Sequence, residues 1–181
     1  MIFSRLLPLF ALALSFSFVS VAKPIAEAGV VKRAGPDVAA VLTSLKAKSD
    51  SVLSQINALV DSGNANSGNV DPLFEMVVDA FDDANAALSK QKGEVSTPNA
   101  GPTKAEVAAV IAPIVVDIAK TMEKAPVSAI FVLDLAMKDF LSTVEVNVGG
   151  TLAVLAGLLS NRGFLLVYVG LRRVAILLGL A

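Results

Sequence analysis

The sequence contains no cysteine, no histidine and no tryptophan among its 181 residues. Disulfide bonds, thiolate or imidazole metal sites, and nucleophilic centres that depend on a histidine base are therefore excluded. The chain also lacks an N-x-Ser/Thr sequon, so N-glycosylation is not expected. A protein of this composition has to be held together by apolar burial and helix packing, which requires a larger core than a disulfide-linked scaffold needs.

Apolar residues supply the material for such a core. They make up 55% of the chain, against ~45–50% in ordinary soluble proteins. Charge is uneven along the sequence: residues 34–147 carry eight lysines and fifteen acidic residues, a net charge of −7, whereas residues 148–181 carry three arginines and no acid. We call residues 148–181 the tail. An acidic body with an apolar, basic tail argues against nucleic-acid binding.

The first 22 residues have the pattern of a signal peptide. Arg5 supplies the positive start, an apolar run follows over residues 6–18, and small residues end at Ala22, the predicted cleavage position. The apolar run is shorter than the ~20 residues of a spanning helix, which makes a retained membrane anchor the weaker alternative. We therefore expect a secreted protein, located in the medium or the cell wall.

A dibasic pair, Lys32 and Arg33, follows shortly afterwards, between a stretch without periodicity and the first periodic segment. Its position predicts a processing site that ends a propeptide of residues 23–33, although exposed basic pairs are often only solvated. The mature protein would then be a helical domain of residues 34–181. We divide it into a helical hairpin (34–92), a linker (93–102) and an apolar helical half (103–181).

Apolar residues recur every three or four positions in the hairpin, which is the spacing of amphipathic helices. For the first helix, Asp37 is the predicted cap and Ser62-Gly63 the predicted end. The polar run 64–69 is predicted to be a loop, with Asp71-Pro72 starting a second helix that ends near Lys92-Gly93. The two stripes are Val38, Leu42, Leu45, Val52, Ile56 and Leu59, and then Phe74, Val77, Val78, Phe81 and Leu88.

The second half begins with a capping box. Thr103 and Glu106 have the S/T-x-x-E spacing in which each side chain can accept a hydrogen bond from the backbone amide of the other residue. Pro113 lies inside the helix that follows, where a kink is expected. Residues 127–141 are apolar on more than one face, which predicts a central, buried helix. The fold class is thus all-α: a bundle of about five helices with an apolar C-terminal helical segment.

A group of three carboxylates, Asp79, Asp82 and Asp83, is the one cluster that resembles a catalytic arrangement. Paired acids can hydrolyse glycosides, but such enzymes also need a sugar cleft, usually with aromatic platforms, and this chain has one tyrosine and no tryptophan. A solvated acidic helix face is the better interpretation. We assign no catalytic, cofactor-binding or metal-binding residue and predict that the protein is not an enzyme.

The tail is the most unusual segment, because its arginines stand among large apolar residues without any acid. Either it forms core helices whose arginines reach the surface, or it is amphipathic and docks on lipid, on another hydrophobic surface or on a second copy. The residues predicted for such an interface are Arg162, Phe164, Leu165, Tyr168, Arg172 and Arg173.

The leader, the pair Lys32-Arg33, the segment 41–65 (VLTSLKAKSDSVLSQINALVDSGNA), a second helix and a Gly/Leu/Val-rich end together resemble small, cysteine-free secreted proteins of mushroom-forming fungi. The resemblance implies a protein of the hyphal wall and matrix, of the type linked to aerial hyphae and attachment. It extends to fungal hydrophobic-surface-binding proteins. The segment 164–173 (FLLVYVGLRR) departs from it, with more bulk and charge than the Gly/Leu ends of such proteins.

These observations predict a secreted structural or surface-active protein of the fungal wall or extracellular matrix. It would work through hydrophobic helix packing and self-association, without a cofactor, and would meet a hydrophobic surface, the cell wall or a lipid interface. Two alternatives stay open: a membrane-associated protein whose tail inserts, and a lipid-binding bundle in which the third and fourth helices hold an acyl chain.

Overall fold

The computed structural model describes residues 38–90 and 101–181, and every regular element within them is helical. The predicted processing residues Ala22, Lys32 and Arg33, the predicted cap Asp37 and most of the predicted linker lie outside the described residues. The all-α prediction is confirmed, with five helices of nine or more residues and shorter elements in the tail. In chain order these are α1 (Val38–Asp61), α2 (Ser67–Ser89), α3 (Lys104–Lys124), α4 (Ile130–Asn147), α5 (Thr151–Leu159), the 3₁₀ helix η1 (Ser160–Arg162), α6 (Gly163–Tyr168) and α7 (Arg172–Leu177).

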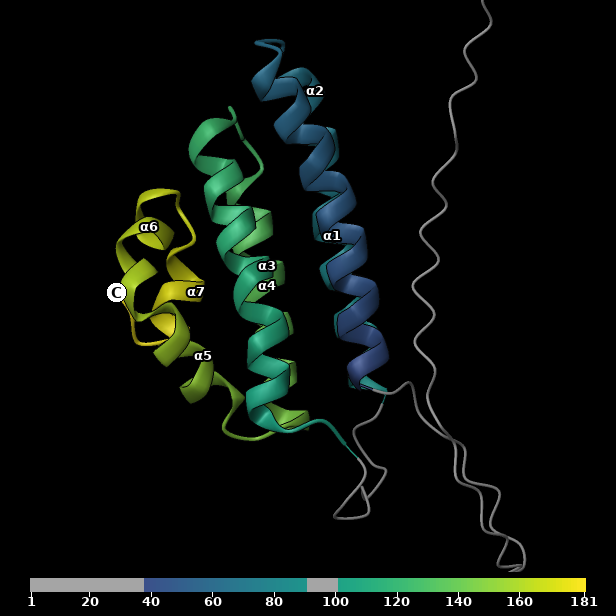
Figure 1. Cartoon of the computed structure of the whole chain (residues 1–181), viewed down its shortest axis with the longest axis vertical. Coiled ribbons are helices and arrows are strands. Elements are labelled where there is room, and N and C mark those ends of the chain that lie inside the picture. Colours follow the sequence, from purple (N-terminus) through teal and green to yellow (C-terminus); the bar gives the residue numbers. More distant parts are fainter. Residues whose placement is uncertain (1–37, 91–100) are drawn as a thin grey trace, which may run out of the picture. The chain divides into compact units, whose positions relative to one another are not determined.

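The four long helices form a bundle to which the tail adds a further layer. α1 packs against α2 and α3, and α2 packs against α4. The tail lies on the α3 and α4 side, with α5 against α3 and α7 against α4, so that in Figure 1 α3 and α4 separate the tail from α1. One core runs through these layers. It includes Phe81 of α2 and Phe140 of α4, whose rings meet edge to face with centroids 5.4 Å apart.

The first helix follows its predicted stripe closely. Leu42, Leu45 and Ile56 are each at most 2% exposed, so the apolar spacing of three and four does mark the buried face. The helix ends at Asp61, and Gly63 follows with φ of +70°. Such a conformation strains any residue with a Cβ atom, and it lets the Gly63 and Asn64 amides bond to carbonyls of the last turn.

The predicted start of α2 at Asp71-Pro72 is wrong. The helix begins at Ser67 and is capped by a reciprocal pair: the Asn69 amide donates to the Asn66 side chain at 3.2 Å, and the Asn66 amide donates to the Asn69 side chain at 2.9 Å. The two asparagines form a capping box like that of Thr103 and Glu106 at α3. The polar run that was predicted to be a loop therefore contains the start of a helix. Pro72 is the sixth residue of this helix and lacks the amide that would bond to the Gly68 carbonyl, and the helix continues past it to Ser89.

The capping box of α3 is confirmed, with the Glu106 amide 3.2 Å from the Thr103 hydroxyl and the Thr103 amide 2.8 Å from the Glu106 carboxylate. These bonds from the Thr103 amide and hydroxyl hold the pKa of Glu106 below its usual value. Pro113 lies inside the helix, which continues to Lys124.

The prediction of a central, buried helix over residues 127–141 is wrong for part of its surface. Leu133, Met137 and Phe140 of α4 are buried, but Phe131 is 60% and Val132 is 52% exposed. The reason is geometric: α2 and the tail cover two faces of α4, and the first turns keep an open face between them. The α4 helix therefore has more exposed apolar surface than the prediction of a central, buried helix implies.

Candidate functional site

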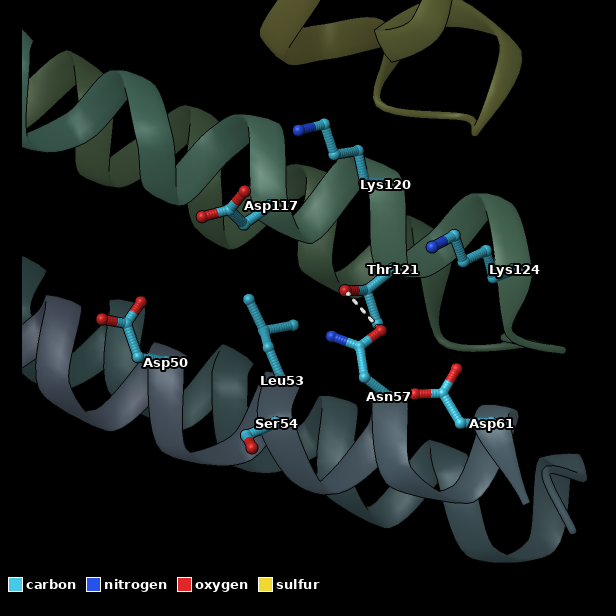
Figure 2. Close-up of a pocket in the computed structure, with 9 residues that line it drawn as sticks. All are labelled: Asp50, Leu53, Ser54, Asn57, Asp61, Asp117, Lys120, Thr121 and Lys124. Carbon is cyan, nitrogen blue, oxygen red and sulfur yellow. Dashed lines mark hydrogen bonds between the residues drawn. The ribbon is translucent and has the colours of Figure 1, made fainter.

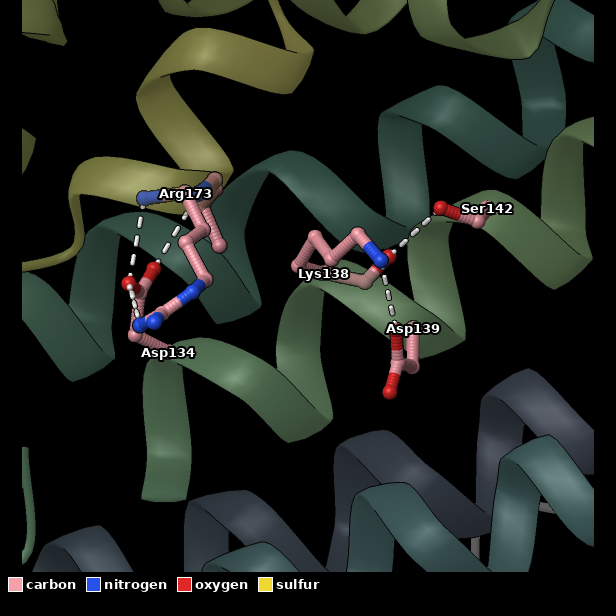
Figure 3. A network of polar contacts seen from close by, with 6 residues as sticks. Asp134, Lys138, Asp139, Ser142 and Arg173 are labelled. Carbon is pink, nitrogen blue, oxygen red and sulfur yellow. Dashed lines mark hydrogen bonds and ion pairs between the residues drawn. The ribbon is translucent and has the colours of Figure 1, made fainter. Parts of the chain in front are cut away.

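An acidic side chain of α4 caps the last helix of the tail. The carboxylate of Asp134, which is 3% exposed, accepts hydrogen bonds from the backbone amides of Arg173 at 3.0 Å and Val174 at 3.1 Å (Figure 3). The Arg173 guanidinium lies 3.4 Å from the same carboxylate. The N-terminal amides of a helix lack intrahelical partners and carry partial positive charge, and α7 receives no bond from its own N-cap side chain. Asp134 supplies the missing acceptor from another helix.

A carboxylate of α4 also caps the start of α5. The Glu145 side chain, at the end of α4, accepts the Gly150 amide at 2.7 Å and the Leu152 amide at 2.8 Å, where α5 has no side-chain cap of its own. Two carboxylates of α4 thus hold two helices of the tail.

A third carboxylate does the same for α4 itself. Asp71 of α2 accepts the Ser128 amide at 2.9 Å and also the Ser128 hydroxyl, just before α4 begins. The side-chain and then the backbone bond from Ser128 hold the pKa of Asp71 below its usual value, because they favour the ionised form. The packing of α4 and the tail is therefore set partly by acidic side chains, of which Asp71 and Asp134 lie far from their partners in the sequence.

One face of the tail belongs to the core. Leu155, Leu159, Leu166, Leu171 and Val174 are at most 1% exposed. Gly163 lies so close to the chain end that a Cβ atom there would come within 2.7 Å of the Leu180 carbonyl oxygen. In this respect the interpretation of the tail as core helices describes the structure.

The other face of the tail is open and aromatic. Phe164 is 84% and Tyr168 is 68% exposed, and their rings stack with centroids 6.1 Å apart. Arg162 precedes them and Arg172 follows them, both exposed. We call Arg162, Phe164, Tyr168 and Arg172 the tail face. Such a pair of exposed aromatic rings between cations is typical of an interaction surface.

The other two predicted interface residues have inward roles. Leu165 is half-buried against the core. Arg173 is bound to Asp134 and also lies over the Phe131 ring, 4.2 Å from its centroid. The Arg173 guanidinium therefore lies between α4 and α7 and helps to hold the tail against α4.

Apolar exposure continues beyond the tail face, on the neighbouring helices. Val132 and Leu135 of α4 and Ile176 of α7 are exposed, Ile176 by 68%. By length and composition, residues Thr151–Tyr168 would also suffice to cross a membrane, and 28% of this stretch is buried. It is not one continuous helix, because η1 interrupts it after α5.

A polar groove of about 470 Å³ lies between α1 and α3 (Figure 2). Its charged lining residues are Asp50 and Asp61 of α1 and Asp117, Lys120 and Lys124 of α3. The Thr121 hydroxyl is within 3.5 Å of the Asn57 amide oxygen rather than a carboxylate, so it is not arranged as an activated nucleophile. In the part of the chain that the structure describes, no three acidic residues come together in a way that could hold a metal ion.

The carboxylates Asp79, Asp82 and Asp83 lie exposed on α2, and Asp83 forms an ion pair of 2.8 Å with Lys48 of α1. This is the solvated helix face that the sequence favours.

Sequence reasoning missed the two carboxylates that attach the tail, Asp134 and Glu145. The partners of Asp134 lie 39 and 40 positions further along the chain, so no local motif marks it. Those of Glu145 lie five and seven positions away, across the turn between α4 and α5. The available signal was Asp134 itself, a single acid on the apolar side of a strongly apolar helix. A buried acid requires hydrogen-bond donors, and the tail with its arginines was the segment able to supply them.

Comparison with known proteins finds similarity to a fungal protein over part of the chain. No family model matches the sequence. Over 78 residues it is 47% identical to fruiting body differentiation protein 16 of Flammulina velutipes, an alignment that covers 42% of this chain and 61% of that protein. The chain thus spans about three fifths of the length of this relative. It is a cysteine-free helical protein related to a fungal fruiting body differentiation protein.

Proposed function

We propose that the protein is a secreted, non-enzymatic structural or surface-active component of the fungal wall or extracellular matrix, acting through its tail face. The observation that carries the proposal is the pair of stacked rings, Phe164 at 84% and Tyr168 at 68% exposure, on a tail whose other face is buried. Large aromatic side chains are rarely left this open on a soluble protein unless they meet a partner surface. The relationship to a fungal fruiting body differentiation protein supports a role in fungal tissue.

Adsorption of the purified protein to hydrophobic beads tests this proposal. The variant Phe164→Ser/Tyr168→Ser removes the aromatic rings without touching the buried residues of the tail, and we expect it to adsorb at least tenfold more weakly. Val146→Ser is the matched control, because Val146 is 64% exposed on α4, outside the tail. Equal adsorption of both variants and the unaltered protein would refute the role of the tail face.

A membrane-associated or lipid-binding protein is the second candidate. Its support is the apolar stretch Thr151–Tyr168, which is 28% buried. Full insertion would have to break the bonds from Glu145 to α5 and from Asp134 to α7, so attachment at the lipid surface fits the structure better. Flotation with liposomes distinguishes the candidates: binding that is lost in Arg172→Gln favours this role, since Arg172 is exposed and Arg173 is held by Asp134.

A further inference from the structure

A second surface of the molecule complements the tail face in polarity and charge. A groove of about 510 Å³ runs between α1 and α2, with mainly apolar walls. Ala47, Val52, Met76 and Ala80 contribute the apolar part. We call this the outer groove. Its volume lies in the range of sites that accept large apolar groups.

The rim of the outer groove is acidic. Asp79 and Asp83 line it, and Lys48 is the basic residue among the groove residues. Lys48 is already paired with Asp83, which leaves the exposed Asp79 without an ion-pair partner among the described residues. The groove therefore combines an apolar wall with a free carboxylate, whereas the tail face combines two aromatic rings with Arg162 and Arg172.

The two surfaces are kept apart within one molecule. The tail packs on α3 and α4, while the outer groove lies between α1 and α2, and Figure 1 shows α3 and α4 between the tail and α1. The tail, held by Asp134 and Glu145, does not reach the outer groove of its own chain. A second copy can bring the tail face to the groove.

We propose that the protein associates head to tail, with the tail face of one copy docked in the outer groove of the next. Phe164 and Tyr168 lie against Ala80 and Met76 in this arrangement, and the tail-face arginines face Asp79. The occupant of the groove is a second copy, because one chain carries both an acidic body of net charge −7 and a basic tail of net charge +3. The tail of one copy is therefore attracted to the body of another. A contact between two different surfaces leaves one of each free on every pair, so it grows into open chains or larger rings rather than closed dimers.

This inference rests on the proposal that the tail face is the working surface, and it adds a specific partner. Sedimentation velocity of the purified full-length protein tests it over a range of protein concentration and salt. We expect the unaltered protein to form a series of oligomers that shortens as salt rises, since part of the attraction is between exposed charges.

Two variants block one surface each. The tail variant is Phe164→Ser/Tyr168→Ser, and the groove variant is Ala47→Tyr/Asp79→Arg, which fills the groove and reverses its rim charge. All four positions are exposed, so the fold is expected to persist, and circular dichroism checks this. Each variant alone should self-associate at least tenfold more weakly than the unaltered protein. Asp117→Arg, an equal charge change at an exposed position of α3, is the control and should leave association unchanged.

Mixing the two variants is the decisive step. One has an intact groove and the other an intact tail face, so the mixture should form dimers that grow no further. Association of the groove variant alone at the level of the unaltered protein would overturn the proposal in favour of contacts between tails. A mixture that stays monomeric, or an unaltered protein that is monomeric throughout, overturns it as well. The groove variant should still adsorb to hydrophobic beads, which separates failure of this inference from failure of the proposed function.

Discussion

Asp134 is buried and lies where the apolar face of α4 meets the start of α7. An unpaired carboxylate at such a position would be costly, and here two backbone amides and a guanidinium satisfy it. The same guanidinium covers the Phe131 ring. At the scale of residues, the attachment of the tail therefore depends on a few polar groups within apolar packing.

Replacing Asp134 by alanine should lower the free energy of unfolding by about 1–3 kcal/mol, because two helix-terminal amides and Arg173 lose their acceptor. Urea unfolding followed by circular dichroism measures the change. Asp139→Asn is the matched control on the same helix: its carboxylate is 46% exposed and pairs with the adjacent Lys138, so a change within about 0.5 kcal/mol is expected. Equal effects of the two substitutions would contradict the capping role.

The Asp71 carboxylate should make stability depend on pH in acid. Its pKa is lowered from 3.8 by the bonds from Ser128, so ionisation stabilises the folded state. That contribution is complete above the unfolded pKa of 3.8 and is lost as pH falls through the lower folded value. The difference in unfolding free energy between the unaltered protein and Asp71→Asn should therefore shrink below this pH.

Urea unfolding of both proteins between about pH 6 and pH 2.5 checks this prediction. The pKa of Glu106 is lowered as well, but Glu106 is present in both proteins. Its contribution to the pH dependence therefore cancels in the comparison. A difference that stays constant across the whole range would show that the Ser128 bond does not depend on the charge of Asp71.

Among the helices, those of the tail are too short to be stable alone, since isolated helices below ~12–15 residues are marginal in water. α6 and α7 have six residues each and α5 has nine. Their stability comes from the buried leucines and from the carboxylates of α4. The long helices differ: α1, α2 and α3 each have an apolar stripe, and α2 and α3 also have a local capping box.

Two glycine substitutions within the tail should have opposite effects on stability. Gly163→Ala should lower the free energy of unfolding by about 1–3 kcal/mol, because the new methyl group would meet the Leu180 carbonyl at 2.7 Å. Gly157→Ala should raise it by about 0.5–1 kcal/mol, since Gly157 lies in α5 and a Cβ atom there meets nothing within 4 Å. Thermal unfolding measures both. Destabilisation of similar size in both variants would mean that the tail is not packed as described.

For the molecule as a whole, the tail has two sides with different consequences. Its inner side closes the α3 and α4 face of the core, and its outer side presents Phe164 and Tyr168. Removing residues 148–181 should therefore do more than abolish adsorption. It uncovers apolar surface of α3 and α4 that a folded bundle needs to bury.

We expect the truncated chain to lose cooperative unfolding and to aggregate, while Phe164→Ser/Tyr168→Ser keeps the helix content and the unfolding midpoint of the unaltered protein. Circular dichroism and sedimentation of both variants test this contrast. A truncated chain that stays folded and monomeric would show that the tail is an appendage rather than part of the core.

Much of this architecture could be read from local patterns. The stripe of α1, its end before Gly63 and the capping box at Thr103 and Glu106 depend on residues within a few positions of one another, and each is confirmed. The start of α2 does not follow from such patterns, because a pair of asparagines forms its capping box within a polar run typical of a loop. The candidate interface was proposed from composition, but its division into exposed and structural residues was not predictable.

What the sequence determined by itself is the helical class, the apolar stripes and the concentration of apolar and basic residues in the tail, since these depend on residue type and on spacing along one helix. The tertiary structure decided which side of the tail is buried, that Arg173 is held by Asp134 and Phe131 while Arg172 is exposed, and that the outer groove lies away from the tail. These depend on contacts between residues tens of positions apart. Such contacts follow from how the helices pack, and no local pattern in the chain encodes them.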